Sequence, residues 1–252
     1  MTKEFEGLTA LVTGSSNGIG AEAAVKFAEH GAAEVLVQYH RGQNEAKRVC
    51  DRIRAAGATA EMFGADLSST SGIQAFLSEL GERRVDILIN NAGSLVNRTP
   101  FLDFTADLWD QVITLNFHSA FHITKHVLPR MVERGRGYVI NVSSVAARNG
   151  GGIGAIGYAS AKGGLSTMTK GLSKEFAPKG IRVNGVSPGT IDTNFHKQFS
   201  TDQMLTNVRN ATPAGRLGDS PETADVILFL CSEAARFIHG QMIEVNGGFL
   251  MV

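Results

Sequence analysis

Short apolar runs rich in β-branched residues alternate along this chain with longer stretches of helical periodicity. Strands that alternate with helices indicate βαβ units, in which the strands run parallel and the helices cover both faces of one sheet. The alternation therefore predicts an α/β fold with one doubly wound parallel sheet. The seven predicted strands span residues 8–12, 35–39, 60–63, 85–90, 138–142, 181–187 and 241–245.

Residues 1–252 are interpreted as a single domain, because no linker, internal repeat or run of charge interrupts the alternation. The length fits one large domain. The longest segment without a strand, residues 188–219, follows a predicted strand and is punctuated by prolines and glycines. Long loops at the carboxyl end of a parallel sheet commonly cover bound substrate. We therefore expect a substrate lid in this segment.

The composition excludes several other classes of protein. Hydrophobic residues make up 43% and charged residues 19%, enough for a core and too little charge for a disordered chain. The 24 basic residues balance the 24 acidic ones, so no net charge attracts nucleic acid or an anionic membrane. No apolar run approaches the roughly 18 residues of a membrane span. Two isolated thiols, Cys50 and Cys231, suit a reducing cytoplasm and predict no metal site.

A glycine-rich turn follows the first predicted strand, with glycines at positions 14, 18 and 20. Such a turn needs residues that tolerate positive φ, and a pyrophosphate needs exposed backbone N–H groups at a helix N-terminus. The spacing is GxxxGxG, which differs from both the common GxGxxG fingerprint and the P-loop. The turn predicts phosphate binding, with a plain glycine-rich connection as the alternative.

The end of the second predicted strand bears on the choice of cofactor. NAD-binding proteins usually carry an acidic residue there, whereas this chain has His40 and Arg41. A guanidinium can pair with the 2′-phosphate of NADP, which an acid would repel. We therefore expect NADP(H) as the preferred cofactor and leave NAD(H) open. The alternative is that Arg41 is a solvated loop charge.

Polar residues also follow the third and fourth predicted strands. Asp66 could accept a hydrogen bond from an adenine amino group, or it could cap the helix that begins near residue 68 or 69. The segment 90–93 (NNAG) combines two amides with small residues that allow close approach to a cofactor. The alternative for this segment is an asparagine-rich turn.

A tyrosine and a lysine four residues apart, Tyr158 and Lys162, share one face of a predicted helix. A nearby ammonium stabilises a phenolate and so favours proton transfer by tyrosine. Ser144 follows the fifth predicted strand, where its hydroxyl could hydrogen-bond a substrate oxygen as charge develops. Taken alone, the pair could equally be a surface contact on a helix.

The motifs occur in one order along the chain: TGSSNGIG at 13–20, NNAG at 90–93, Asn116, Ser144, YASAK at 158–162 and PGTIDT at 188–193. Together they resemble the short-chain dehydrogenase/reductase family from about residue 8 to residue 248. The resemblance implies a Rossmann-like domain that transfers hydride to or from a nicotinamide cofactor.

The resemblance also implies four catalytic roles. Tyr158 would be the general acid/base, and Lys162 would hold the nicotinamide ribose and lower the pKa of Tyr158. Ser144 would orient the substrate carbonyl. Asn116 would hold a water that links Lys162 to solvent as a proton relay.

The cofactor contacts implied by the resemblance follow the same motifs. The glycine turn would line the pyrophosphate, residues 66–67 the adenine, and Asn90 the adenosine ribose side. The PGTIDT segment would hold the nicotinamide, with Thr193 on its carboxamide. The expected cofactor-binding residues are Gly14, Ser16, Asn17, Gly18, Ile19, Gly20, His40, Arg41, Asp66, Leu67, Asn90, Ala92, Gly93, Tyr158, Lys162, Pro188, Gly189, Ile191 and Thr193.

Two features depart from the family pattern. Ser144 and Tyr158 are 14 positions apart, one more than is commonest in the family, and a run of glycines between them can absorb the extra residue. Asn17 stands where strongly NADP-selective relatives often carry a basic residue, which weakens the expectation of NADP.

Three further features have a structural and a functional interpretation. His118, His122 and His126 share one helix stripe and could bind zinc, but packed or hydrogen-bonded histidines are the preferred interpretation. Trp109 lies among apolar residues and is expected in the core. Apolar residues of the lid, including Phe195 and Met204, either form a substrate wall or pack the loop down.

We expect an oxidoreductase that interconverts a ketone and a secondary alcohol of a small molecule. One candidate substrate is a 3-oxoacyl thioester, whose acidic carrier would need a basic rim such as Arg134, Arg136 and Lys179. These residues are more simply interpreted as helix-end charges. The alternatives are a sugar or polyol dehydrogenase, a broad carbonyl reductase, or a catalytically silent cofactor-binding regulator. The resemblance of the last strand further implies a homotetramer.

Overall fold

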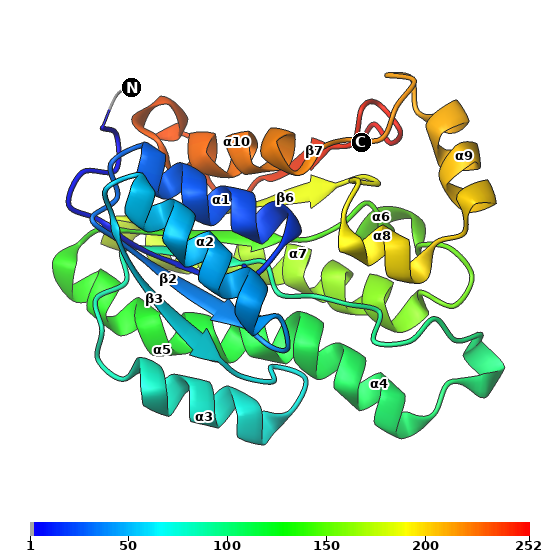
Figure 1. Cartoon of the computed structure of the whole chain (residues 1–252), viewed down its shortest axis with the longest axis horizontal. Helices are drawn as coiled ribbons and strands as arrows, with labels where there is room; N and C mark the ends of the chain where they lie inside the picture. Colours follow the sequence, from blue (N-terminus) through cyan, green and yellow to red (C-terminus); the bar gives the residue numbers. More distant parts are fainter. Residues whose placement is uncertain (1–2) are drawn as a thin grey trace.

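The computed structural model describes residues 3–252, apart from the side chains of residues 196 and 197. Seven parallel strands form one sheet in the order β3-β2-β1-β4-β5-β6-β7, which confirms the predicted fold class (Figure 1). The strands are β1 (Thr9–Val12), β2 (Glu34–Tyr39), β3 (Thr59–Gly64), β4 (Ile87–Asn90), β5 (Gly137–Val142), β6 (Ile181–Pro188) and β7 (Met242–Val245).

Helices cover both faces of the sheet (Figure 1). Helices α1, α2 and α10 pack on one face, and α3, α5 and α7 on the other. The helices are α1 (Gly18–Glu29), α2 (Gln43–Ala55), α3 (Thr70–Leu80), α4 (Ala106–Ile113), α5 (Ser119–Arg134), α6 (Ala146–Asn149), α7 (Ile156–Phe176), α8 (Asn194–Phe199), α9 (Asp202–Ala211) and α10 (Ser220–Cys231). Among the residues described, no helix is long and apolar enough to cross a membrane.

Alternation along each strand divides the core into two layers. In β1, Ala10 and Val12 point to the layer under α1 and α10, whereas Leu11 points to the layer under α3 and α5. All three are fully buried. Because both faces of the sheet are covered, the central strands β1, β4 and β5 have largely apolar sequences. Burial of a leucine such as Leu11 stabilises the fold by roughly 1.5–3 kcal/mol.

The sequence over residues 105–133 has continuous helical periodicity, but the structure interrupts it. α4 ends at Ile113, a π-helical turn spans Thr114–His118, and α5 begins at Ser119. The expectation that Trp109 lies in the core is wrong. Its side chain is 37% exposed and packs edge-on against Phe104, because this face of α4 turns away from the sheet.

The proposed basic rim lies at the wrong edge of the sheet. Arg134 ends α5 and donates a hydrogen bond to the carbonyl of Val85, just before β4 begins. Arg136 directly precedes β5, and Lys179 lies two residues before the start of β6. All three residues thus lie at the amino ends of the strands. Their interpretation as helix-end charges fits the structure, and they do not border a cavity at the carboxyl ends.

Candidate active site

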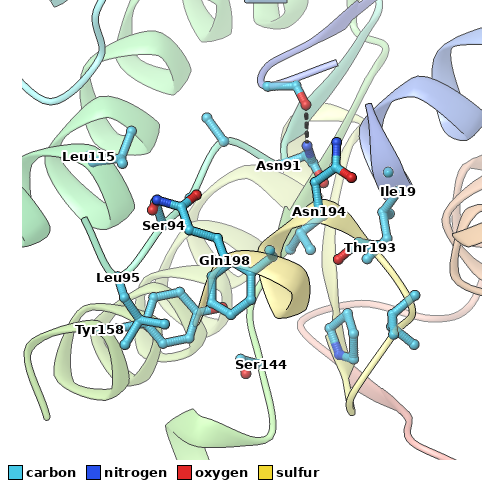
Figure 2. A pocket seen from close by; sticks show the side chains of 18 of the residues that line it. Ile19, Asn91, Ser94, Leu95, Leu115, Ser144, Tyr158, Thr193, Asn194 and Gln198 are labelled. Atoms are coloured by element: carbon cyan, nitrogen blue, oxygen red, sulfur yellow. Dashed lines mark hydrogen bonds between the residues drawn. The ribbon is translucent and has the colours of Figure 1, made fainter. Parts of the chain in front are cut away.

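A cavity of about 1180 Å³ opens at the carboxyl ends of the strands, where the order reverses between β1 and β4. Parallel sheets bind ligands at such reversals. Leu95, Tyr158 and Ser144 lie toward one end of the cavity, and Asn91, Ile19 and Thr193 toward the other (Figure 2). The expected residues that line it are Gly14, Ser16, Asn17, Gly18, Ile19, His40, Arg41, Asp66, Leu67, Ala92, Gly93, Ser144, Tyr158, Lys162, Pro188, Gly189, Ile191 and Thr193.

The glycine turn joins β1 to α1 at the floor of this cavity. Gly14 and Gly18 have φ of +62° and +59°, the left-handed region that favours glycine. A Cβ on Gly14 would lie 2.8 Å from the Cα of Ala92, so the turn also needs the space. Gly20, in the first turn of α1, does not line the cavity and instead lets Asn91 approach the backbone of Gly14. The first turn of α1 carries no acidic residue, which leaves its N-terminus suited to an anion.

Gln38 near the end of β2 is a site residue that the sequence analysis missed. It is 2% exposed, and its Oε1 accepts a hydrogen bond of 2.9 Å from the N–H of Gly14. Its Nε2 donates to the carbonyls of Tyr39 and Ala65 at 2.8 and 2.9 Å. One side chain therefore fixes the glycine turn to the ends of two neighbouring strands. A glutamine in an otherwise apolar strand is the signal that could have revealed it.

The two asparagines at the end of β4 point to opposite sides of the strand. The Asn90 side chain does not line the cavity. Strand alternation points it into the core, where Nδ2 donates to Oγ1 of Thr124 and Oδ1 of Asn141 at 2.9 and 2.8 Å. Asn91 faces the cavity instead, and its Nδ2 donates to the carbonyls of Thr13 and Gly14. The expected contact of Asn90 with the adenosine ribose side therefore stays a prediction, and it would not involve a side chain that borders the cavity.

At the adenosine end, Asp66 makes a local turn rather than a helix cap. Its Oδ1 accepts hydrogen bonds from the N–H and the hydroxyl of Ser68, and Ser69 is the N-cap of α3. Burial alone would raise the pKa of Asp66, but the Ser68 hydrogen bonds and the charges of His40 and Arg41 lower it. The carboxylate thus stays ionised beside two basic residues that line the same end of the cavity.

The tyrosine and the lysine of α7 meet at the other end. Lys162 is 2% exposed, its Nζ lies 5.6 Å from the Tyr158 ring centroid, and it donates to the carbonyl of Val142 at 2.8 Å. Burial raises the pKa of Tyr158 to about 12, although hydrogen bonding with Ser144 opposes it, and burial lowers the pKa of Lys162 to about 7. The two causes acting on the pKa of Tyr158 are burial and the Ser144 hydrogen bond, so the lowering by Lys162 that the resemblance implies stays a prediction.

Asn116 lies in the π-helical turn and is 1% exposed. Its Oδ1 accepts from the N–H of Ser94 at 3.1 Å, and its Nδ2 donates to the carbonyls of Ser94 and Val112 at 2.7 and 2.8 Å. A Cβ on Gly93 would lie within 3.0 Å of both the Asn116 Oδ1 and the Lys162 Nζ, so the two side chains converge there. Because the Asn116 amide is fully engaged, a bound water would depend on its main-chain oxygen.

The lid expected over residues 188–219 contains two helices, α8 and α9. The ring of Phe195 in α8 lies 5.7 Å from the ring of Tyr158 and 5.1 Å from that of Phe199. Leu95 and Ala155 complete this small cluster. Phe195 and Met204 both line the cavity, which favours the substrate-wall interpretation.

The histidine stripe runs from the π-helical turn, which holds His118, into α5, which holds His122 and His126. Nε2 of His126 lies 2.7 Å from the carbonyl of Gly81, which anchors α5 to the end of α3. In the described part of the chain no group of three or more histidine, cysteine, aspartate or glutamate side chains is placed to hold a metal ion.

The chain matches a family model described as enoyl-(acyl carrier protein) reductase over residues 14–250. It is 36% identical to the 3-oxoacyl-[acyl-carrier-protein] reductase FabG of Escherichia coli over 98% of this chain and 99% of the relative. A gluconate 5-dehydrogenase of Burkholderia cenocepacia, solved with NADP and tartrate, superposes with a TM-score of 0.88 at 32% identity, covering 98% and 96% of the two chains. An NADH-dependent reductase responsible for alginate metabolism, A1-R′, superposes with a TM-score of 0.88 at 34% identity, covering 99% of this chain and 100% of that chain.

The match extends over almost the whole chain at every level of comparison. The family model, the sequence relative and the solved structures all span the glycine turn, the YASAK helix and the lid. The chain therefore belongs to the short-chain dehydrogenase/reductase family, the NAD(P)-dependent oxidoreductases that interconvert alcohols and carbonyl compounds.

Proposed function

We propose that this protein is an NADP(H)-dependent oxidoreductase that interconverts a ketone and a secondary alcohol, with Tyr158 as the general acid/base. The observation that carries the proposal is the placement of Tyr158, Ser144 and Lys162 in one cavity with the glycine turn. One end of that cavity suits a pyrophosphate, and the other end holds a phenol, a hydroxyl and an ammonium.

The residues at the glycine turn fit a dinucleotide. Gly14 and Gly18 hold the turn open, and the N-terminus of α1 meets the cavity without an acidic side chain. Arg41 lies exposed at the rim, next to Ser16 in the cavity lining, where a guanidinium would bind a 2′-phosphate. The NADP in the gluconate 5-dehydrogenase structure supports this preference, whereas the NADH-dependent A1-R′ keeps NAD(H) open.

Bound nicotinamide would supply or accept the hydride. In the direction of reduction, Tyr158 donates its phenolic proton to the substrate oxygen, and its raised pKa keeps it protonated at neutral pH. Ser144 donates a hydrogen bond to the same oxygen as negative charge develops. Lys162, with a pKa of about 7, can exchange a proton with Tyr158 near neutral pH. The main-chain oxygen of Asn116 would hold the water of the proposed relay.

The cavity favours a compact polar ketone of the sugar or polyol class. Asn149, Asn194 and Gln198 line the cavity, and their amides can donate to and accept from hydroxyl groups. The similarity to a gluconate 5-dehydrogenase supports this class. By contrast, the basic residues considered for an acidic acyl carrier lie at the opposite edge of the sheet.

A 3-oxoacyl thioester is the second candidate substrate. Met204, Leu205 and Val208 of α9 line the cavity and could contact an acyl chain. The 36% identity to FabG supports this alternative.

The proposal is tested by comparing the wild type with Tyr158→Phe in steady-state assays. NADPH and NADH are each offered with 5-ketogluconate and with an acetoacetyl thioester. Tyr158→Phe should lower kcat by about 10²–10⁴-fold while NADPH still binds. Tyr138→Phe, which alters a buried tyrosine outside the cavity, is the control and should retain turnover. Equal turnover by Tyr158→Phe and the wild type would contradict the mechanism.

We also propose a homotetrameric assembly and a cytoplasmic location. Apolar side chains lie exposed on α10 and towards the C-terminus, with Phe229 43%, Phe237 98% and Met251 81% exposed, which supports burial against other subunits. Light scattering after size-exclusion chromatography should give four times the mass of 26.8 kDa. Both cysteines are free and buried, which suits a reducing compartment. Cell fractionation tests the location.

A further inference from the structure

Arg98 joins three segments at the substrate end of the cavity. Its Nε donates to the carbonyl of Phe199, the last residue of α8, at 2.9 Å. Its Nη1 donates to the carbonyl of Ile153, in the glycine-rich loop before α7, at 2.7 Å. The N–H of Thr99 adds a bond to the carbonyl of Gly154 at 3.3 Å. A side chain from the loop after β4 therefore holds the lid helix to the loop that leads to Tyr158.

Helix α8 forms the roof over Tyr158. It carries Phe195, whose ring packs against Tyr158, and Phe199, whose ring packs against Phe195. Leu95, 3% exposed, belongs to the same cluster and comes from the same loop as Arg98. The position of α8 consequently sets how much room the substrate has beside the Tyr158 hydroxyl.

The loop that carries Arg98 is itself rigidly held. Asn116 bonds both the N–H and the carbonyl of Ser94, and the Ser94 hydroxyl accepts from the N–H of Val96 at 3.0 Å. The N–H of Asn97 reaches the carbonyl of Leu95 at 2.6 Å, which closes a γ-turn around Val96. Val96 has φ of 60° and is the one non-glycine residue with positive φ among residues 3–252. A β-branched residue there is strained, so the turn is held by its surroundings.

We propose that Arg98 is a latch that holds α8 closed over the substrate, and thus a positioning residue for the reaction. This inference rests on the proposed function of Tyr158. A guanidinium suits the task because its rigid fork can donate to carbonyls on two separate segments at once. Both acceptors are neutral, and Arg98 is only partly buried, so the latch can open for substrate exchange.

The latch is tested with Arg98→Met and Arg98→Lys in the full-length protein. Arg83→Met is a matched control, because Arg83 also donates to two main-chain carbonyls, those of Glu79 and Leu80, but lies outside the cavity. Deuterium exchange of the amides of residues 194–199 is measured without ligands. KM and kcat are then measured for a neutral and for an anionic ketone, and the Kd of NADPH by fluorescence.

Arg98→Met should accelerate exchange in residues 194–199 and raise KM for both ketones about tenfold, equivalent to about 1.4 kcal/mol. The Kd of NADPH should change less than about twofold, since the latch touches no residue of the glycine turn. Arg98→Lys, which keeps one donor, should give intermediate values. The Arg83→Met control should match the wild type in all three measurements.

Three results would overturn the latch. Unchanged exchange in residues 194–199 would show that Arg98 does not hold α8. A rise in KM confined to the anionic ketone would show direct recognition of substrate charge instead. A lower KM would show that the closed lid obstructs the substrate. If the wild type turns over no ketone, the proposed function fails, but the exchange experiment still decides whether Arg98 holds the lid.

Discussion

The buried ammonium of Lys162 should make the stability of the ligand-free protein depend on pH. Burial lowers its pKa from 10.5 to about 7. Between these two values the unfolded chain binds a proton that the folded protein does not, so the free energy of unfolding rises with pH. The folded protein is thus destabilised most below pH 7, and the penalty disappears as the pH approaches 10.5.

The size of the effect follows from the shift. Each pKa unit corresponds to about 1.4 kcal/mol, so the full penalty approaches about 5 kcal/mol. Between pH 7 and pH 9 the free energy of unfolding should rise by about 2 kcal/mol from this group alone. Lys162→Met removes the titrating group, so its free energy of unfolding should not show this rise between pH 7 and pH 9. Within that range, the variant should exceed the wild type in stability most at pH 7.

Urea denaturation of both proteins at several pH values between 7 and 9 measures the difference. Other titrating groups, including the cysteines whose pKa is raised by burial, contribute equally to both proteins and cancel. Lys174→Met is the matched control, because Lys174 lies exposed on the same helix and should keep the wild-type slope. If Lys162→Met shows the same pH dependence as the wild type, the buried lysine is not the group that titrates.

Three further predictions follow from the cavity. Gly14→Ala places a side chain at a positive φ, with its Cβ only 2.8 Å from the Cα of Ala92. It should lower the free energy of unfolding by about 2–3 kcal/mol, lower Tm by about 5–10 °C and weaken NADPH binding. A thermal melt that gives the wild-type Tm would refute the steric argument. Arg41→Ala should weaken NADPH binding about tenfold to hundredfold and leave NADH unchanged, and equal effects on both would exclude Arg41 as the reader of the 2′-phosphate. Val96→Gly should relieve backbone strain and raise Tm by about 2–4 °C; a lower Tm would show that the Val96 side chain matters more than its φ.

Features that depend on local periodicity could be predicted from the sequence. The alternation of apolar runs and helices predicts the parallel sheet, because burial of both faces requires continuous apolar strands such as β1 and β4. The glycine turn and the YASAK helix were predictable for the same reason. The functional groups of each motif lie within one or two turns of the chain, so sequence spacing alone places Tyr158 and Lys162 on one face of the helix.

Features that depend on tertiary packing could not be predicted from the sequence. Whether Asn90 or Asn91 faces the cavity depends on which residue ends β4, and a shift of one position reverses the two. The π-helical turn at Asn116 interrupts a periodicity that looks continuous. Arg98 acts across segments far apart in the chain, so no local pattern indicates its role. The exposure of Trp109 likewise depends on the orientation of α4, whose Trp109 face turns away from the sheet.

The hydrogen bonds that begin at Asn90 continue beneath the cavity. Asn90 donates to Thr124 of α5 and to Asn141 of β5, and Asn141 donates to Thr169 of α7 at 2.8 Å. Sliding α7 along the sheet would break the bond from Asn141 to Thr169 and leave a buried amide N–H of Asn141 unpaired, at a cost of about 1–3 kcal/mol.

The helix that carries Tyr158 is therefore held in place by groups that do not line the cavity. The residues that shape the substrate end come from separate loops above it. New substrate preferences can accordingly arise by exchange of lid and loop residues while the catalytic geometry is inherited unchanged. This separation makes the scaffold a suitable starting point for directed evolution.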